Sequence, residues 1–207
     1  RCPFCYSPEL VLPEIMRKHP AISEKKFFNF LKERKGFLTG VCITGGEPTV
    51  HQDLPDFVIK IKKMGFFVKL DTNGSYPEML GKLIGNKLID YVAMDIKGPK
   101  ERYGEIVGML GCWDEGMLNN IKKSIEILKE GKVDYEFRST IVPGIHAKED
   151  VIEMAKRIKG AKRYYLQSFR PEKTINPELE KIKPYPQEFL LEIQKAISPF
   201  FEICQVR

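Results

Sequence analysis

The sequence lacks the features that mark several large classes of protein. No apolar run approaches the roughly 20 residues needed to cross a membrane, and no secretory signal peptide is visible. The five cysteines among 207 residues have no regular spacing, which argues against a secreted domain built on disulfides. We therefore expect a cytoplasmic protein without a membrane partner.

The sequence also has only a small excess of charge of one sign and few histidines. The 34 Lys and Arg residues against 28 Asp and Glu give a net charge of +6. Because these charges are spread along the chain, they predict a solvated surface and no nucleic-acid partner. The only histidines are His19, His51 and His146. None of them ends an apolar strand, which speaks against a zinc-dependent barrel hydrolase.

No low-complexity segment or linker divides the chain, so we expect a single domain over residues 1–207. Helical spacing covers residues 23–35, 53–64, 77–85, 117–130, 148–159 and 186–197, and strand-like runs cover 39–44, 66–71, 89–95, 133–142, 162–168 and about 200–206. Ser23 and Asp53 are expected N-caps, and Gly131 is an expected C-cap residue. This alternation predicts an α/β fold with a parallel sheet, specifically a partial, open (β/α)6 barrel of the TIM type.

Two cysteines open the chain, in Arg1-Cys2-Pro3-Phe4-Cys5-Tyr6. Cysteine thiolates bind both iron–sulfur clusters and zinc, so the pair alone is equally compatible with half of a zinc site or a thioredoxin-like redox pair. A thioredoxin-like pair should begin a long helix, which Pro13 and Pro20 would interrupt. Zinc would require a second pair, and the remaining cysteines are scattered and expected to be buried small residues: Cys42, Cys112 and Cys204.

A second motif, Thr44-Gly45-Gly46-Glu47-Pro48-Thr49, follows the strand expected at 39–44, which should be buried. Glycine lets a ligand approach the backbone closely. Glu47 can accept charge-assisted hydrogen bonds from an ammonium group. An ordinary βα turn is the alternative, but the motif downstream of Cys-x-aromatic-Cys is far more specific than Gly-Gly alone.

Further polar residues stand at or near strand ends, which a parallel barrel brings to one face. The carboxylates of Asp71 and Asp95 could bind ribose hydroxyls or a cation, and Lys97 could bind a carboxylate. Thr72 and Asn73 could instead cap the next helix, and Arg138 could pair with Glu136, which shares its face of the strand. Gln167 and Arg170 complete the ring.

These motifs resemble those of the radical S-adenosylmethionine (SAM) enzymes, whose cluster loop reads C-x-x-x-C-x-aromatic-C. Cys2 and Cys5 match its second and third cysteines, so the first would precede Arg1, as would most of the family's first strand. Residues 70–74, 94–97 and 137–144 resemble glycyl-radical-enzyme activases such as pyruvate formate-lyase activating enzyme. The opening residues and the short length are similar to the activating proteins of anaerobic ribonucleoside-triphosphate reductases.

The resemblance implies a [4Fe–4S] cluster held by Cys2, Cys5 and an upstream cysteine, and SAM bound over the strand ends. It implies that Gly45, Gly46 and Glu47 bind the amino group of SAM and that Arg138 contacts its methionine part. The ribose or carboxylate of SAM would be bound by Asp71, Asn73, Asp95 and Lys97, with a monovalent cation as an option, and Gln167 would also line the SAM site. No side chain is expected to act as a general acid or base.

The implied reaction is reductive cleavage of SAM to methionine and a 5′-deoxyadenosyl radical, which takes a hydrogen from a glycine of a partner enzyme such as an anaerobic ribonucleotide reductase. Reduced flavodoxin or ferredoxin would donate the electron. Residues 100–116, which include the only tryptophan, Trp113, are expected to be irregular and either contact the partner or simply connect a strand to a helix. The alternatives are a radical SAM enzyme acting on a small molecule and a non-catalytic domain that binds SAM or a partner.

Overall fold

A parallel sheet of six strands forms the centre of the computed structural model, which describes residues 2–109, 111 and 114–207. The strands follow one another in chain order, and every neighbouring pair is parallel: β1 (Gly40–Ile43), β2 (Phe67–Thr72), β3 (Tyr91–Asp95), β4 (Asp134–Ile141), β5 (Arg163–Ser168) and β6 (Ile203–Val206). Within the described residues β1 and β6 are not paired with each other. The open, partial barrel is therefore confirmed.

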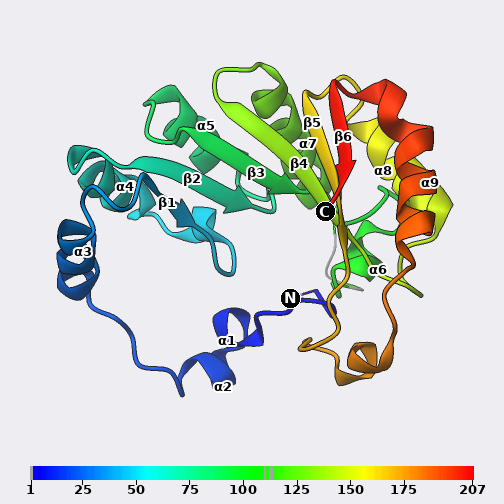
Figure 1. Ribbon diagram of the computed structural model, residues 1–207, viewed down its shortest axis with the longest axis horizontal. Helices are drawn as coiled ribbons and strands as arrows, with labels where there is room; N and C mark the ends of the chain where they lie inside the picture. Colours follow the sequence, from blue (N-terminus) through cyan, green and yellow to red (C-terminus); the bar gives the residue numbers. More distant parts are fainter. Residues whose placement is uncertain (1, 110, 112–113) are drawn as a thin grey trace.

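Six longer helices occupy the segments predicted to be helical: α3 (Glu24–Glu33), α4 (Leu54–Lys63), α5 (Pro77–Gly85), α7 (Glu115–Lys129), α8 (Lys148–Arg157) and α9 (Gln187–Ile197). Three helices of four residues were not predicted: α1 (Pro8–Val11), α2 (Pro13–Met16) and α6 (Tyr103–Ile106). The last of these lies in the stretch expected to be irregular. Figure 1 shows the longer helices after β1 on the outer side of the sheet and α1 and α2 across from its other side. Helix α3 lies next to α4 at the β1 end of the sheet, where Phe27 and Phe28 contact Phe57.

The predicted helix ends agree with the structure at two of three positions. The side chain of Ser23 accepts the N–H of Lys26 at 3.3 Å, and Gly131, just beyond α7, has a φ of 72°. Asp53 makes no side-chain capping bond, so that prediction is wrong. Its own backbone is already helical, with φ −86° and ψ −1°, whereas a capping residue is normally extended.

Side chains alternate between the two faces of each strand. Leu70, Met94 and Phe137 are fully buried in the core formed with the outer helices. The opposite face, which we call the inner face, carries polar residues, and the register sets Asp95 beside Arg138. The polar residues predicted at or near the strand ends therefore share the inner face, which does not pack against the outer helices.

The buried setting expected for Cys42 is wrong. Cys42 and Gly40 are exposed because β1 is an edge strand with a partner on one side only, and Cys42 lies on the inner face, in register with Lys69. Cys204 is half-buried, and burial raises the pKa of its thiol to about 11. The expectations for Cys112 and Trp113 fall outside the described residues.

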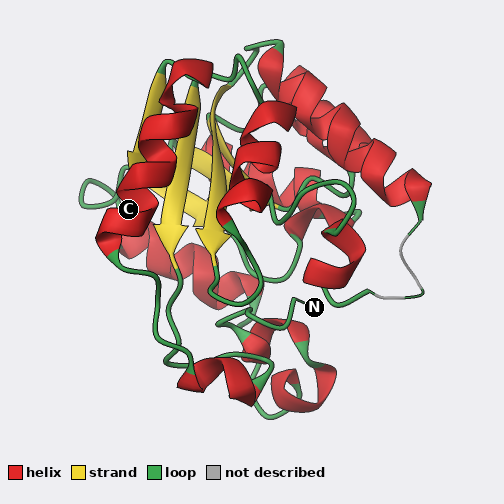
Figure 2. Ribbon diagram, turned by 90° about the vertical axis from the view of Figure 1, so that its right-hand side faces the viewer, coloured by secondary structure: helices red, strands yellow, loops and turns green. Residues whose placement is uncertain are grey.

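The N-terminal segment lies beyond the carboxyl ends of the strands. Figure 2 shows it below the arrowheads of the sheet. The two short helices α1 and α2 follow it instead of one long helix, as Pro13 predicts. Among the described residues no helix is both long enough and apolar enough to span a bilayer.

Candidate functional site at the carboxyl ends of the strands

Two carboxylates are joined by one arginine at the carboxyl end of the sheet. Arg138 donates through Nε to Oδ1 of Asp95 at 3.0 Å and through Nη1 to Oδ2 of Asp71 at 3.2 Å. The three residues meet because β2, β3 and β4 are adjacent. The alternative pairing of Arg138 with Glu136 does not form: Glu136 accepts the hydroxyl of Tyr91 at 2.8 Å instead.

Lys97 extends this network of charges. Its ammonium lies 3.2 Å from Oδ2 of Asp95. Burial would raise the pKa of Asp95, but Lys97 and Arg138 outweigh burial and hold that pKa below its ordinary value. Burial also opposes the charge of Lys97, yet the negative charge of Asp95 beside it raises the pKa of the ammonium. These groups are therefore charged at neutral pH, and they present fixed charges to a ligand.

One oxygen of Asp71 has no hydrogen-bond partner. The ammonium of Lys69 lies 2.8 Å from Oδ1 of Asp71, but its direction does not satisfy hydrogen-bond geometry, so this buried oxygen is unpaired among the described residues. Leaving a buried acceptor unpaired is costly. The oxygen therefore keeps hydrogen-bonding capacity for a ligand hydroxyl, while the Lys69 ammonium supplies a positive charge beside it.

The carboxylate of Glu47 ties the turn after β1 to the end of β2. Its Oε1 accepts the backbone N–H of Thr49 at 3.2 Å, the hydroxyl of the same residue, and the hydroxyl of Thr72 at 2.7 Å. Among the described residues its Oε2 accepts only the N–H of Asn73, at 2.7 Å. Glu47 thus has a bridging role that the sequence did not predict, and Oε2 still has room for a donor from a ligand.

Glycines shape the same edge of the sheet. Gly45 has a φ of 140° and Gly74 a φ of 75°, and both values favour glycine. A Cβ on Gly46 would lie 3.3 Å from the carbonyl oxygen of Leu10, so this glycine lets α1 approach the turn. A Cβ on Gly45 would have no described heavy atom within 4 Å other than those of its chain neighbours, so that side of the turn is open to a ligand.

The cysteine loop, Cys2–Cys5, is a tight turn. The N–H of Cys5 donates to the carbonyl of Cys2 at 3.0 Å, and Pro3 occupies the second position, which its fixed φ favours. Both thiols are free and half-buried. Between them Phe4 is buried in a small apolar cluster with Ile106, Val142, Phe169 and Leu179. The loop is thereby seated over the ends of β4 and β5.

His146 is a residue of this region that the sequence analysis did not select. It is almost fully buried, its Nδ1 accepts the N–H of Val142 at 3.0 Å, and its Nε2 donates to the carbonyl of Lys97 at 2.9 Å. Burial lowers its pKa, so the ring is neutral, and its edge meets Phe4 with the ring centres 5.9 Å apart. The sequence around His146 contains no recognisable motif that would have selected this residue.

The remaining predicted residues occupy varied positions. The Oδ1 of Asn73 accepts the N–H of Ser75 at 2.9 Å, so its side chain supports the local turn. Gln167 is half-buried on the inner face of β5, in register with Thr140 of β4. Arg170 is exposed.

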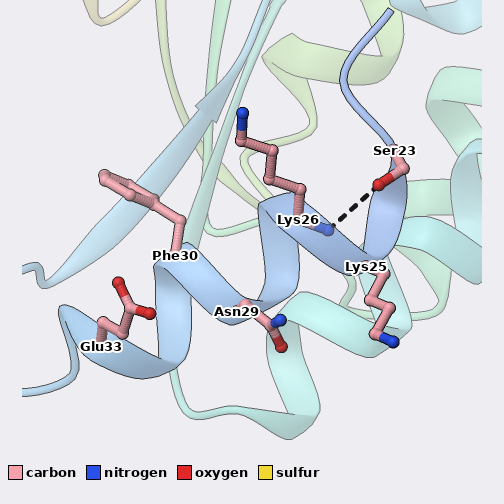
Figure 3. Close-up of a pocket in the computed structure, with 6 residues that line it drawn as sticks. All are labelled: Ser23, Lys25, Lys26, Asn29, Phe30 and Glu33. Atoms are coloured by element: carbon pink, nitrogen blue, oxygen red, sulfur yellow. Dashed lines mark hydrogen bonds between the residues drawn. The ribbon is translucent and has the colours of Figure 1, made fainter.

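A surface hollow of about 430 Å³ lies away from these residues. Figure 3 shows that its lining comes entirely from α3 and the Ser23 cap: Ser23, Lys25, Lys26, Asn29, Phe30 and Glu33. A hollow made by one helix does not enclose a ligand, and we do not associate it with the site.

Comparison with known proteins places this chain in a family. A profile described as the radical SAM superfamily matches residues 1–158. This chain belongs to the radical SAM superfamily. A protein of Methanocaldococcus jannaschii, named provisionally as a glycyl-radical enzyme activating enzyme, is 35% identical over 214 residues, which cover 100% of this chain and 84% of that protein. A probable GTP 3′,8-cyclase of Thermococcus kodakarensis is 28% identical over 69% of this chain and 50% of its own length.

Solved structures share the fold of this radical SAM enzyme. A domain of a pyruvate-formate lyase-activating enzyme from Bacteroides vulgatus aligns with a TM-score of 0.59 and 16% identity, over 79% of this chain and 98% of that domain. Streptococcus suis SuiB bound to SAM aligns with a TM-score of 0.70 and 16% identity, over 99% of this chain and 47% of SuiB. At this level of identity the two alignments support the fold alone.

Membership of the radical SAM superfamily implies a [4Fe–4S] cluster and SAM. The donors in this structure are consistent with both: two free thiols on one preorganised turn, and next to them an edge of fixed charges with an unpaired carboxylate oxygen. Among the described residues no group of three or more Cys, His, Asp or Glu side chains forms a complete metal site. A further thiolate is therefore needed beside Cys2 and Cys5.

Proposed function

We propose that this radical SAM enzyme activates a glycyl-radical enzyme, specifically an anaerobic ribonucleotide reductase. The observation that carries the proposal is the seating of the cysteine loop over the strand ends, beside the charges of Asp71, Arg138 and Asp95. The relative from Methanocaldococcus jannaschii supports activation of a protein partner. The bound cofactors would supply one-electron reductive cleavage of SAM and removal of a hydrogen atom from glycine.

In this proposal the chain binds the cluster and SAM, orients SAM and shields the reacting groups from water. Cys2 and Cys5, with an upstream cysteine, hold the cluster. The open side of Gly45, the adjoining backbone of Gly46 and the free capacity of Oε2 of Glu47 receive the SAM ammonium group.

The fixed charges at the strand ends complete the proposed SAM site. Lys97 pairs with the SAM carboxylate, Arg138 orients the methionine part, and Asp71 and Asp95 accept the ribose hydroxyls. Asn73 and Gln167 line the same edge. Reduced flavodoxin or ferredoxin is the proposed electron donor.

A monovalent cation is a second element of the proposal. The Oδ1 of Asp71, which has an ion pair with Lys69 but no hydrogen bond among the described residues, is a hard oxygen donor that a cation could share beside the proposed SAM carboxylate. Binding of SAM should then be tighter in a potassium buffer than in one whose only cation is tetramethylammonium, at equal ionic strength. Equal affinity in the two buffers would remove the cation from the proposal.

The reaction is tested by 5′-deoxyadenosine formation. The full-length chain is loaded with the cluster under anaerobic conditions, reduced, and supplied with SAM. We expect product from the wild type and from Cys204→Ala, whose side chain on β6 packs against the core formed with the outer helices, and none from Cys5→Ala. A cluster-loaded wild type that forms no product would favour the non-catalytic alternative, a domain that binds SAM or a partner.

The partner is tested by electron paramagnetic resonance. An anaerobic ribonucleotide reductase of the same organism is added to the loaded chain with SAM and reductant, and we expect a glycyl-radical signal on the reductase. A reductase whose radical glycine is replaced by alanine is the control. If formation of 5′-deoxyadenosine depends instead on a small molecule, and the reductase gives no radical signal, the small-molecule alternative is supported. The GTP 3′,8-cyclase relative belongs to that class by its name.

A further inference from the structure

The segment between β5 and α9, residues 169–185, crosses the cysteine loop. We call this segment the strap. Figure 1 shows it, yellow to orange, descending from the end of β5 past the N-terminal segment. The N–H of Ile175 donates to the carbonyl of Cys5 at 3.1 Å, and the N–H of Asn176 donates to the carbonyl of Pro3 at 2.9 Å. Two backbone acceptors of the loop are therefore paired with residues more than 160 positions away in the sequence.

The part of the strap that makes these bonds is itself held in shape. The hydroxyl of Thr174 donates to the carbonyl of Asn176 at 2.6 Å, and the N–H of Thr174 donates to Glu180 at 3.0 Å. The side chain of Asn176 accepts the N–H of Glu178 at 3.1 Å. Thr174 is buried, which is unusual for threonine in a connecting segment.

Both ends of the strap are anchored near the loop. At its start Phe169 is buried in the cluster around Phe4, and Leu179 joins the same cluster. At its end the hydroxyl of Tyr185 donates to the carbonyl of His146 at 2.9 Å, and the ring of His146 contacts Phe4. The loop is thus held by the strand ends through Phe4 and by the strap through its backbone.

We propose that the strap positions the cysteine loop for cluster binding, with the N–H groups of Ile175 and Asn176 as the positioning groups. Cys2, Pro3 and Cys5 each have a carbonyl paired in this arrangement. A loop whose backbone is already ordered loses less conformational entropy when its thiolates bind a metal cluster. The strap therefore slows release of the cluster. This consequence rests on the proposed function, whereas the effect of the strap on the loop does not.

Position 176 allows the N–H group to be tested against a matched control. Asn176→Pro removes the donor and requires φ to move from −94° toward about −65°, in a backbone that is already extended before Pro177. Asn176→Ala keeps the N–H and removes only the side-chain cap. Both variants lose the bond to Glu178, so the difference between them reports the bond to Pro3.

Two measurements on the full-length chain test the strap. In the metal-free chain, we expect the amide of Cys5 to exchange hydrogen about fivefold to tenfold faster in Asn176→Pro than in Asn176→Ala, the loss expected for one hydrogen bond. In the cluster-loaded chain, we expect iron release to a chelator to be faster by a similar factor. Because coupling is reciprocal, loading the wild type should also slow exchange at Ile175 and Asn176.

The outcomes separate the strap from the proposed function. Equal exchange at Cys5 in the two variants, with both folded by circular dichroism, would overturn the positioning role. Different exchange but equal iron release would show a strap that orders the loop without retaining the cluster, and would overturn the proposal as stated. If the wild type takes up no cluster while the exchange difference persists, the proposed function fails and the order imposed by the strap on the loop remains.

Discussion

Arg138 is the cation on which two neighbouring carboxylates depend. Its side chain is 13% exposed, and Asp71 and Asp95 both bind it. Without it the two acids would face each other in a partly buried setting, where like charges repel strongly. The sequence predicted Asp71 and Asp95 at strand ends and Arg138 within a strand, and the tertiary structure showed that one guanidinium joins the two acids.

We predict that Arg138→Met lowers the free energy of unfolding by about 3 kcal/mol, the lower end of the range for breaking a buried ion pair. The matched control is Arg163→Met, which removes a pair with Asp134, a side chain that is 52% exposed. A solvent-screened pair of this kind contributes about 1 kcal/mol or less. Urea unfolding of both variants is the measurement, and equal losses would contradict a special role for Arg138.

At the scale of elements, the end of β2 depends on a glycine. Gly74 follows Thr72 and Asn73, has a φ of 75°, and packs so closely on β3 that a Cβ would lie 2.0 Å from Cε of Met94. Its carbonyl accepts the hydroxyl of Ser124 on α7 at 2.7 Å. This turn connects the inner face to the outer helices.

We therefore predict that Gly74→Ala destabilises the protein by about 2–3 kcal/mol, through the left-handed backbone and the overpacked contact. Gly85→Ala is the control, because a Cβ there meets no described heavy atom within 4 Å beyond its immediate chain neighbours and the local helix backbone. That change should be neutral or slightly stabilising, by less than about 1 kcal/mol. Thermal unfolding measures both, and a tolerated Gly74→Ala would show that the turn adapts.

The regular elements were mostly predictable because their apolar periodicity is strong. Residues 77–85 were predicted to be helical, and α5 covers that range. The four-residue helices α1 and α6 were missed, since a single turn has too few residues to show a period. The exposure of Cys42 was missed for another reason: an apolar edge strand has the same pattern as a central one.

For the whole molecule, His146 connects the cysteine loop to the sheet through Phe4 and the carbonyl of Lys97. Burial lowers its pKa below its ordinary value. The unfolded chain therefore binds this proton more tightly than the folded chain does. The stability contributed by the neutral, buried ring of His146 is therefore complete above the pKa of the unfolded chain, about 6.5, and it decreases as the pH falls through and below that value.

We predict that the unfolding free energy of the wild type falls more steeply between about pH 7 and pH 5 than that of His146→Gln. His146→Gln should be less stable at neutral pH, and its difference from the wild type should shrink on acidification. Urea unfolding across this range is the measurement, and parallel curves for wild type and His146→Gln would contradict the prediction.

The sequence by itself determined the parallel α/β class, the six strands and the family motifs, because periodicity and short motifs are local properties. Only the tertiary structure decided that Arg138 bridges Asp71 and Asp95, and that the strap binds the cysteine loop. These contacts join backbone and side-chain groups that lie far apart in the chain. They depend on the order of the strands and the path of the connections, for which no local pattern carries a signal.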